Sequence, residues 1–112
     1  MFRALFREKI RFIKQYRENG NLLDIGAGVG LLVSEAERLG FVAVGLEPSK
    51  SAVAAAKKCF GLSLVPKEFT AKQISQHFDI LTLNHILEHL PNPKRVINGA
   101  GKVLQRGGLL VI

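Results

Sequence analysis

The chain has 112 residues and a formal net charge of +7, a length that allows one domain with a single hydrophobic core. Its apolar runs are shorter than the roughly 18 residues of a membrane span, and charged residues interrupt the start, so neither a membrane-spanning helix nor a secretory signal is predicted. The single cysteine, Cys59, has no partner for an internal disulfide, which favours a reducing, cytoplasmic location.

The positive charge raises the question of a polyanionic partner, such as RNA or an acidic membrane. The basic residues are spread along the chain, and there is no tryptophan. We therefore favour a solvated basic surface and do not predict a nucleic-acid partner.

Residues 2–18 predict an amphipathic helix. Apolar residues recur there at spacings of three and four, and basic residues occupy much of the remainder. We expect Gly20 to form the C-terminal cap, and the helix to pack on the core near the ligand cleft and not on a membrane. The chain then divides into a leading helix, residues 1–20, and a binding domain, residues 21–112. The apolar positions are Phe2, Leu5, Phe6, Ile10, Ile13 and Tyr16.

A strand at 21–25 leads into a glycine-rich turn and then a helix at 29–39, which Gly40 ends. Gly26, Gly28 and Gly30 stand at alternate positions of the turn. Glycines let a turn close tightly and let a ligand approach the backbone, and the start of the helix offers unpaired N–H groups. This pattern predicts a ligand-binding turn.

A second apolar run, 41–46, ends on Glu47, and Pro48 and Ser49 open a helix at 49–59 with Ser49 as its cap. A glycine turn followed by an acidic end to the second strand is the layout of a nucleoside-binding half-domain. The Glu47 carboxylate has two acceptor oxygens, which suit both hydroxyls of a ribose.

The remaining pattern alternates between helices and strands, which predicts an α/β fold with a doubly wound, Rossmann-like parallel sheet. We expect about five strands in the order 3-2-1-4-5, helices on both faces, and a ligand cleft at the carboxyl ends of strands one, two and four. These later elements are a strand at 62–65, a short helix at 70–74, a strand at 78–84, a short helix at 86–90, a helix at 93–104 capped by Asn92, a turn at 106–108 and a strand at 109–112.

Two motifs suggest other chemistries. The dinucleotide pattern G-x-G-x-x-G/A fails at Leu31, so an NAD-linked oxidoreductase is a weaker alternative. His85, Glu88 and His89 match the zinc pattern H-x-x-E-H. However, a zinc site needs a third protein ligand, and no Asp, Glu, His or Cys follows His89. We therefore predict no metal.

Four segments together carry a family resemblance. They are Asp24-Ile25-Gly26-Ala27-Gly28-Val29-Gly30, the acid Glu47, Leu87-Glu88-His89 with Pro91, and Arg106-Gly107-Gly108, where the usual first residue is proline. Over residues 21–112 the chain resembles the class I S-adenosylmethionine-dependent methyltransferases, in their small-molecule branch.

This resemblance implies S-adenosylmethionine as the cofactor and a small molecule as the methyl acceptor. It implies that Asp24 faces the ammonium group of the cofactor, that Asn84 and His85 lie beside the sulfonium and the acceptor, and that His85 is a candidate general base. Residues 66–69 depart from the family's third motif, so that only Glu68 and Phe69 are left to contact the adenine. The implied cofactor-binding residues are Asp24, Gly26, Ala27, Gly28, Gly30, Glu47, Pro48, Glu68, Phe69, Asn84 and His85.

The resembled family has a seven-stranded sheet, and its last two strands would follow Ile112. We therefore expect the strand at 109–112 to be an apolar, unpaired edge. Either the chain is a fragment of a longer enzyme, truncated after the fifth strand, or this edge pairs with a second copy. A non-catalytic module that binds the cofactor is the alternative function.

Overall fold

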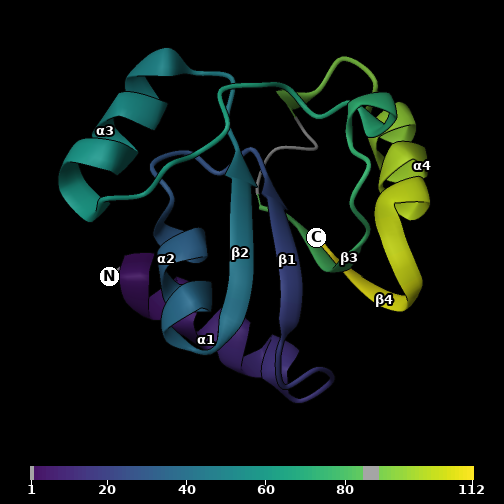
Figure 1. Cartoon of the computed structure of the whole chain (residues 1–112), viewed down its shortest axis with the longest axis horizontal. Coiled ribbons are helices and arrows are strands. Elements are labelled where there is room, and N and C mark those ends of the chain that lie inside the picture. The colour runs from purple at the N-terminus through teal and green to yellow at the C-terminus, as the bar shows by residue number, and fades with distance from the viewer. Residues whose placement is uncertain (1, 85–88) are drawn as a thin grey trace.

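The computed structural model describes residues 2–84 and 89–112. A parallel sheet carries helices on both faces (Figure 1). Within these described ranges, no helix is both long enough and apolar enough to cross a membrane. The elements are α1 (Phe2–Lys14), β1 (Gly20–Ile25), α2 (Leu31–Arg38), β2 (Phe41–Leu46), α3 (Lys50–Phe60), the 3-10 helix η1 (Ala71–Gln73), β3 (Phe78–Leu83), α4 (Pro93–Val103) and β4 (Leu104–Val111).

The sheet confirms the predicted fold class but has four strands, in the order β2-β1-β3-β4, where we expected about five. The missing strand is the one predicted at 62–65, which is reduced to a single parallel bridge between Val65 and Leu46. Val65 lies beside β2, where the predicted order puts the third strand. Pro66 follows directly and has no N–H group, so the pairing does not continue past Val65.

The first connection also differs from the prediction, because α1 ends at Lys14 and Gly20 begins β1 instead of capping the helix. The intervening loop is held by Asp79 of β3. Arg17 forms an ion pair with the Asp79 carboxylate at 3.0 Å, and the Asn21 N–H donates to it at 2.9 Å. A Cβ at Gly20 would lie 2.6 Å from Asp79 Oδ2, so only glycine fits this close approach.

The predicted cap of α4 is confirmed, since the Asn92 side chain accepts a hydrogen bond from the Arg95 N–H at 3.2 Å. The strand after it is longer than predicted. It begins at Leu104, and the turn expected at 106–108 is absorbed into β4 as an irregularity opposite Phe78 and Ile80. Gly107, with φ at 78°, lets the strand bend there without breaking its pairing with β3.

Side-chain alternation along the central strands divides the core between the two faces of the sheet. Leu22 of β1 and Ile80 of β3 face α1 and α2, whereas Leu23 and Leu81 face α4 and η1. The helices contribute Ile10, Ile13, Leu32 and Ala36 to the first face, and Ala100 and Val103 to the second.

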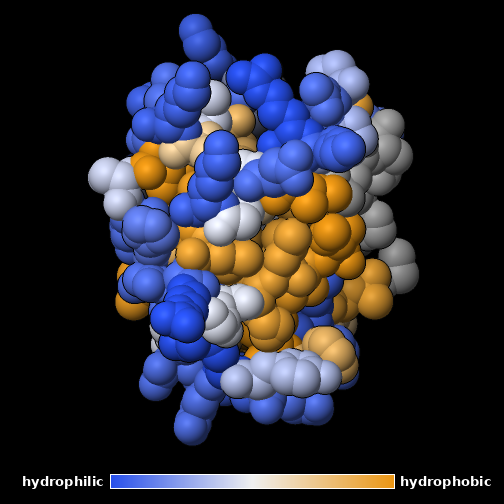
Figure 2. Space-filling view, turned by 90° about the vertical axis from the view of Figure 1, so that its right-hand side faces the viewer, coloured by the Kyte–Doolittle hydropathy of each residue, from blue (hydrophilic) through white to orange (hydrophobic). Residues whose placement is uncertain are grey.

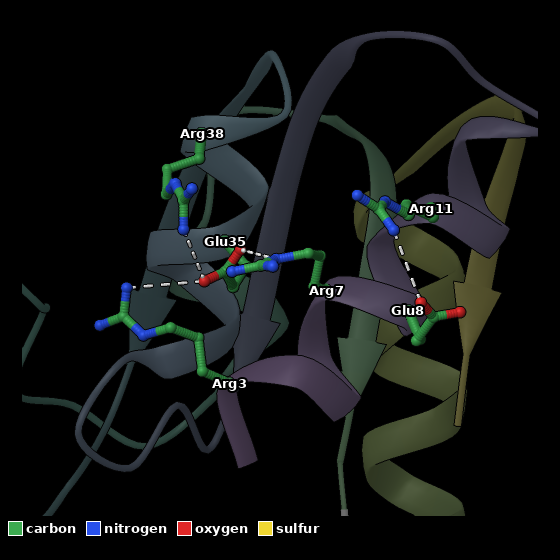
Figure 3. A network of polar contacts seen from close by, with 6 residues as sticks. All are labelled: Arg3, Arg7, Glu8, Arg11, Glu35 and Arg38. Atoms are coloured by element: carbon green, nitrogen blue, oxygen red, sulfur yellow. Dashed lines mark hydrogen bonds and ion pairs between the residues drawn. The ribbon is translucent and has the colours of Figure 1, made fainter. Parts of the chain in front are cut away.

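A buried carboxylate fixes α1 on α2. Glu35 of α2 is only 1% exposed, and three guanidinium groups surround it (Figure 3). Arg38 lies at 3.2 Å, Arg7 at 3.4 Å and Arg3 at 3.6 Å. A buried carboxylate is tolerated only when it is paired in this way, so the position of α1 on α2 depends on these ion pairs. The position of α1 in turn determines which residues Lys9, on the next turn of the helix, can contact.

Replacing Gly45 of β2 with alanine should destabilise the fold by about 1–3 kcal/mol, because the added methyl overpacks the core. Its Cβ would lie 2.7 Å from Leu64 Cδ2, 2.8 Å from Ala27 Cβ and 3.0 Å from Val33 Cγ2. The measurement is urea unfolding. Gly101→Ala is the matched control. Its Cβ meets nothing within 4 Å in α4, and it should stabilise the fold by up to about 1 kcal/mol. An equal loss in both variants would contradict this account.

Candidate functional site

The glycine turn between β1 and α2 is tied to the end of β2. The N–H groups of Gly26 and Ala27 donate to the Leu46 carbonyl at 2.9 and 2.8 Å. The Gly28 N–H donates to Glu47 Oε1 at 2.8 Å. The turn and the acidic strand end, far apart in the sequence, therefore form one unit at the carboxyl end of the sheet.

The Glu47 carboxylate points toward the turn and is half-buried. Its second oxygen accepts from the Ser49 N–H at 2.8 Å. A carboxylate offers about four acceptor positions, so two oriented N–H groups leave capacity for further donors. The group is thus held in place and can still accept hydrogen bonds from hydroxyls of a ligand.

The glycines of the turn differ in the space around them. A Cβ at Gly28, where φ is +60°, would meet nothing within 4 Å, so this position faces open space. A Cβ at Gly30 would lie 2.6 Å from Leu62 Cδ1, which makes Gly30 a packing glycine between α2 and the chain after α3. Ala27 also packs inward, among the side chains around Val33. Among these three residues, the open approach is at Gly28.

A cleft of about 860 Å³ adjoins the turn. Residues 67–72 and α4 line its other walls. Phe69 rests against α4 at Gly99, where an added Cβ would lie 3.2 Å from the ring, so this glycine lets the ring pack closely on α4. His89 also lines the cleft. Of the predicted site residues, the cleft is lined by Gly26, Glu47, Pro48, Glu68 and Phe69.

Charge is distributed unevenly around this cleft. Glu47 and Glu68 are its carboxylates, and basic side chains dominate the walls formed by residues 67–72 and α4. This charge distribution favours a ligand that places a positively charged group near Glu47 and away from α4. The basic lining residues are Lys67, Lys72, Lys94, Arg95 and Lys102.

Asp24 is the penultimate residue of β1, next to the turn, and is only 2% exposed. The parallel register places it beside Thr82, whose hydroxyl donates to Asp24 Oδ1 at 2.7 Å. The pKa of Asp24 is raised to about 7, mainly by burial and to a small extent by the charge of Glu47, and the Thr82 hydrogen bond and the charge of Lys9 only partly offset this rise. The carboxyl group is thus only partly ionised at neutral pH, and a cation beside it would favour the ionised form.

Asn84 follows β3 and meets α1. Lys9 Nζ donates a hydrogen bond to Asn84 Oδ1. The other atom of the amide, Nδ2, is buried and has no hydrogen-bond partner in the described part of the chain. Buried amide nitrogens are normally paired, so this N–H group is available to an acceptor that enters the site.

The structure brings Asp24, Glu47 and Asn84 together at the end of the sheet, as the sequence predicted for strand ends. Sequence reasoning missed Thr82 and Lys9. Thr82 interrupts the apolar run 78–84 at the position opposite Asp24. Lys9 lies on the same stripe of α1 as Phe6 and Ile13, by a spacing of three and four, and that position was the available signal.

The predicted general base, His85, and the candidate zinc residue Glu88 lie outside the described residues, as does most of the short helix predicted at 86–90. Their roles stay predictions.

A family model described as a methyltransferase domain matches residues 1–112. Among curated proteins, the chain is 29% identical over 109 residues to the ubiquinone biosynthesis O-methyltransferase of Hydrogenovibrio crunogenus, covering 89% of this chain and 45% of that protein. It is 33% identical over 96 residues to the enzyme of the same name from Bradyrhizobium sp. ORS 278, covering 81% and 38%. The chain spans about half the length of the curated relatives it matches.

Solved structures agree on the fold. The S-adenosylmethionine-bound amino pentose methyltransferase of Micromonospora echinaspora, from calicheamicin biosynthesis, superposes with a TM-score of 0.79 at 21% identity, covering 98% of this chain and 50% of that one. A glycopeptide N-methyltransferase complexed with sinefungin gives 0.74 at 21% identity, covering 95% and 52%. The arrangement of strands and helices around the turn is therefore that of methyltransferase structures.

Asp24 should make stability depend on pH. Its pKa is about 7 in the fold and near 3.9 in the unfolded chain, so between those values the folded state keeps a proton that the unfolded state releases. Stability should therefore fall by roughly 4 kcal/mol as pH rises from about 4 to 7. In Asp24→Asn this loss should be absent, as measured by urea unfolding across that window.

Glu37→Gln, on the exposed face of α2, is the control for removal of a carboxyl group. Parallel stability profiles for Asp24→Asn and the wild type would contradict the account of Asp24.

Proposed function

We propose that this chain, which belongs to the methyltransferase domain family, binds S-adenosylmethionine at the glycine turn and supports methyl transfer to a small-molecule acceptor. One observation carries the proposal: the Glu47 carboxylate is held against the turn at Gly28, where an added side chain would meet open space. This is the pairing of backbone and anion that an adenosyl group requires.

The residues at the site fit this cofactor. Glu47 would accept hydrogen bonds from the ribose hydroxyls, and the turn at Gly26 and Gly28 would leave room for the ligand's close approach. Pro48, Glu68 and Phe69, which line the cleft beside Glu47, would contact the adenine. The remaining polar groups, a buried carboxyl and an amide without a partner, are suited to the amino-acid end.

The cofactor supplies an activated methyl group on its sulfonium, so the protein's contribution is mainly orientation. We propose that Asn84 lies beside the reacting centre and that His85 accepts a proton from the acceptor. The acceptor class is inferred from the family, whose relatives are named as O- and N-methyltransferases. The family match supports this reading over an NAD-linked oxidoreductase.

A second candidate is a module that binds the cofactor without turnover. Methyl transfer by the 112-residue chain to any acceptor would exclude it. We further propose a cytoplasmic location, which the exposed, free thiol of Cys59 supports.

The edge of β4 supports self-association. β4 lies at one end of the sheet order, so one of its sides has no strand partner among the described residues. Apolar side chains gather on the face that contains α4 and β4 (Figure 2). Leu109, Leu110 and Val111 are only partly buried there, and Ile112 is 61% exposed. An unpaired apolar edge is a template for another strand, and we propose a second copy as its partner.

Cofactor binding is tested by calorimetry with S-adenosylhomocysteine, which we expect to bind the wild type. Gly28→Ala should weaken binding at least tenfold, because its methyl group would occupy the open space beside Glu47 that the proposed ligand needs. Gly61→Ala is the matched control. Both glycines have left-handed backbones, with φ of +60° and +67°, and an added Cβ meets nothing within 4 Å at either. Both variants should lose about 1–2 kcal/mol of stability, but only Gly28→Ala should lose affinity. No heat with folded wild type would refute the proposal.

Self-association is tested by sedimentation velocity over a range of concentrations. We expect a dimer that dissociates on dilution, and weaker dimerisation in Ile112→Lys, since a charge next to an edge strand opposes strand pairing. A Val42→Lys variant, at an exposed position on β2 at the opposite side of the sheet, should leave the dimer unchanged. A monomer at every concentration would exclude pairing through β4.

A further inference from the structure

We infer that the cleft beside the glycine turn holds an anionic group of the methyl acceptor, a phosphate or a carboxylate. The inference rests on the proposed function and deepens it, because it names the chemical class of the acceptor. Two walls of the cleft, the segment 67–72 and α4, would bind this group. We call them the basic walls, and their cations are Lys67 and Lys72 on the first, and Lys94, Arg95 and Lys102 on the second.

Apolar contacts hold the two basic walls against each other. An added Cβ at Gly99 of α4 would lie 3.2 Å from the Phe69 ring and 3.4 Å from the Ala71 Cβ. Phe69, Ala71 and Val96 also pack on the buried core of this face of the sheet. The core therefore positions the backbones of both walls, and their cations border the same cleft.

The protein does not neutralise the five cations of the basic walls. None of them forms an ion pair within the described residues, whereas every arginine of α1 and α2 forms one. No Asp or Glu follows Glu88 in the sequence, so α4 and β4 carry positive charge only. Like charges around one cleft repel each other and attract anions from solution. An anionic ligand would relieve this repulsion.

Two of these cations stand where a helix disfavours positive charge. Lys94 and Arg95 lie in the first turn of α4, which contains no acidic residue. The partial positive charge of a helix N-terminus stabilises anions and destabilises cations within that turn. The fold therefore gains nothing from these two charges at this place. The site does not depend on this helix end alone, because Lys67 and Lys72 approach the cleft from the other wall.

The donors on α4 suit an anion with several oxygens. Lys94, Asn98 and Lys102 recur at a spacing of four, which places them along one face of the helix, and all three line the cleft. The Arg95 guanidinium can donate two parallel hydrogen bonds to a phosphate or a carboxylate. Ammonium, amide and guanidinium donors are thus available to one ligand group.

This anionic group belongs to the acceptor and not to the cofactor. The negative group of S-adenosylmethionine is the carboxylate of its amino-acid end. Asp24 and Asn84, which are proposed for that end, do not line the cleft. The adenosyl part and the sulfonium carry no negative charge, so they give the basic walls nothing to bind.

The test is calorimetry at low ionic strength with two anionic probes, inorganic pyrophosphate and citrate, in the presence of saturating S-adenosylhomocysteine. We expect the wild type to bind at least one probe, and the tighter one indicates whether the acceptor carries phosphate or carboxylate. Lys94→Gln and Lys67→Gln, one change on each basic wall, should each weaken binding about tenfold, since each removes a charge-assisted hydrogen bond. Lys58→Gln is the matched control. It changes an exposed lysine of α3 outside the cleft and should bind the probes like the wild type.

Stability without a ligand gives a second readout. Lys94→Gln removes a cation from the first turn of α4, so its midpoint of urea unfolding should rise. Lys58→Gln removes a cation from the last turn of α3, where positive charge is favourable, so its midpoint should fall or stay the same. A lower midpoint for Lys94→Gln would mean that Lys94 serves the fold, and would overturn its assignment to a ligand.

The outcomes separate this inference from the proposed function. If the wild type binds S-adenosylhomocysteine but neither anion, the inference is wrong and the proposed function stands. Anion binding that S-adenosylhomocysteine abolishes would also overturn it, because the cations would then border the position of the cofactor. Equal weakening in Lys58→Gln would reduce the effect to the net charge of +7.

A nucleic-acid surface is the competing explanation of the basic walls. A single-stranded RNA that competes with the probes, and binds more tightly as it lengthens, would replace the small anionic acceptor with RNA and overturn the inference. If S-adenosylhomocysteine does not bind, the proposed function fails, and the assignment of the anion to a methyl acceptor fails with it.

Discussion

The site depends on the hydrogen bond between the Gly28 N–H and the Glu47 carboxylate. It joins a turn that follows β1 to the tip of β2, and it directs an anion toward Gly28, where an added side chain would meet open space. The carbonyl of Leu46 strengthens the same link through the N–H groups of Gly26 and Ala27. Without these hydrogen bonds, no carboxylate would be held in a fixed orientation against the glycine turn.

A second constraint acts from the opposite side of the turn. Glu35 is a single buried carboxylate that forms ion pairs with three arginines, two of them on α1. The position of α1 therefore depends on these ion pairs as well as on apolar packing. The leading helix therefore lies beside the carboxyl end of the sheet. Its Lys9 donates a hydrogen bond to Asn84, the residue that follows β3.

Local patterns predicted most of the fold and about half of the site. β2 matches its predicted bounds because a short apolar run between Gly40 and Glu47 leaves few alternatives. The glycine turn and Glu47 were predictable because each can be recognised from a short stretch of consecutive residues. Val65 forms a single bridge with Leu46 of β2 instead of a strand, and Pro66, which has no N–H group, prevents the pairing from continuing past it. Lys9 and Thr82 could not be assigned, because their contacts with Asn84 and Asp24 arise only when α1, β1 and β3 are packed together.

In the proposed cofactor site, the buried carboxyl of Asp24 would link ligand binding to pH. Below about pH 7 the group holds a proton, which an ammonium placed beside it would displace. The apparent affinity for such a ligand would then decrease up to tenfold for each further unit of acidification. Near neutrality, binding would release a fraction of a proton, so the observed heat would vary with the ionisation enthalpy of the buffer. Through Asp24, which is hydrogen-bonded to Thr82, uptake of a cationic ligand at the proposed site would be accompanied by release of a proton.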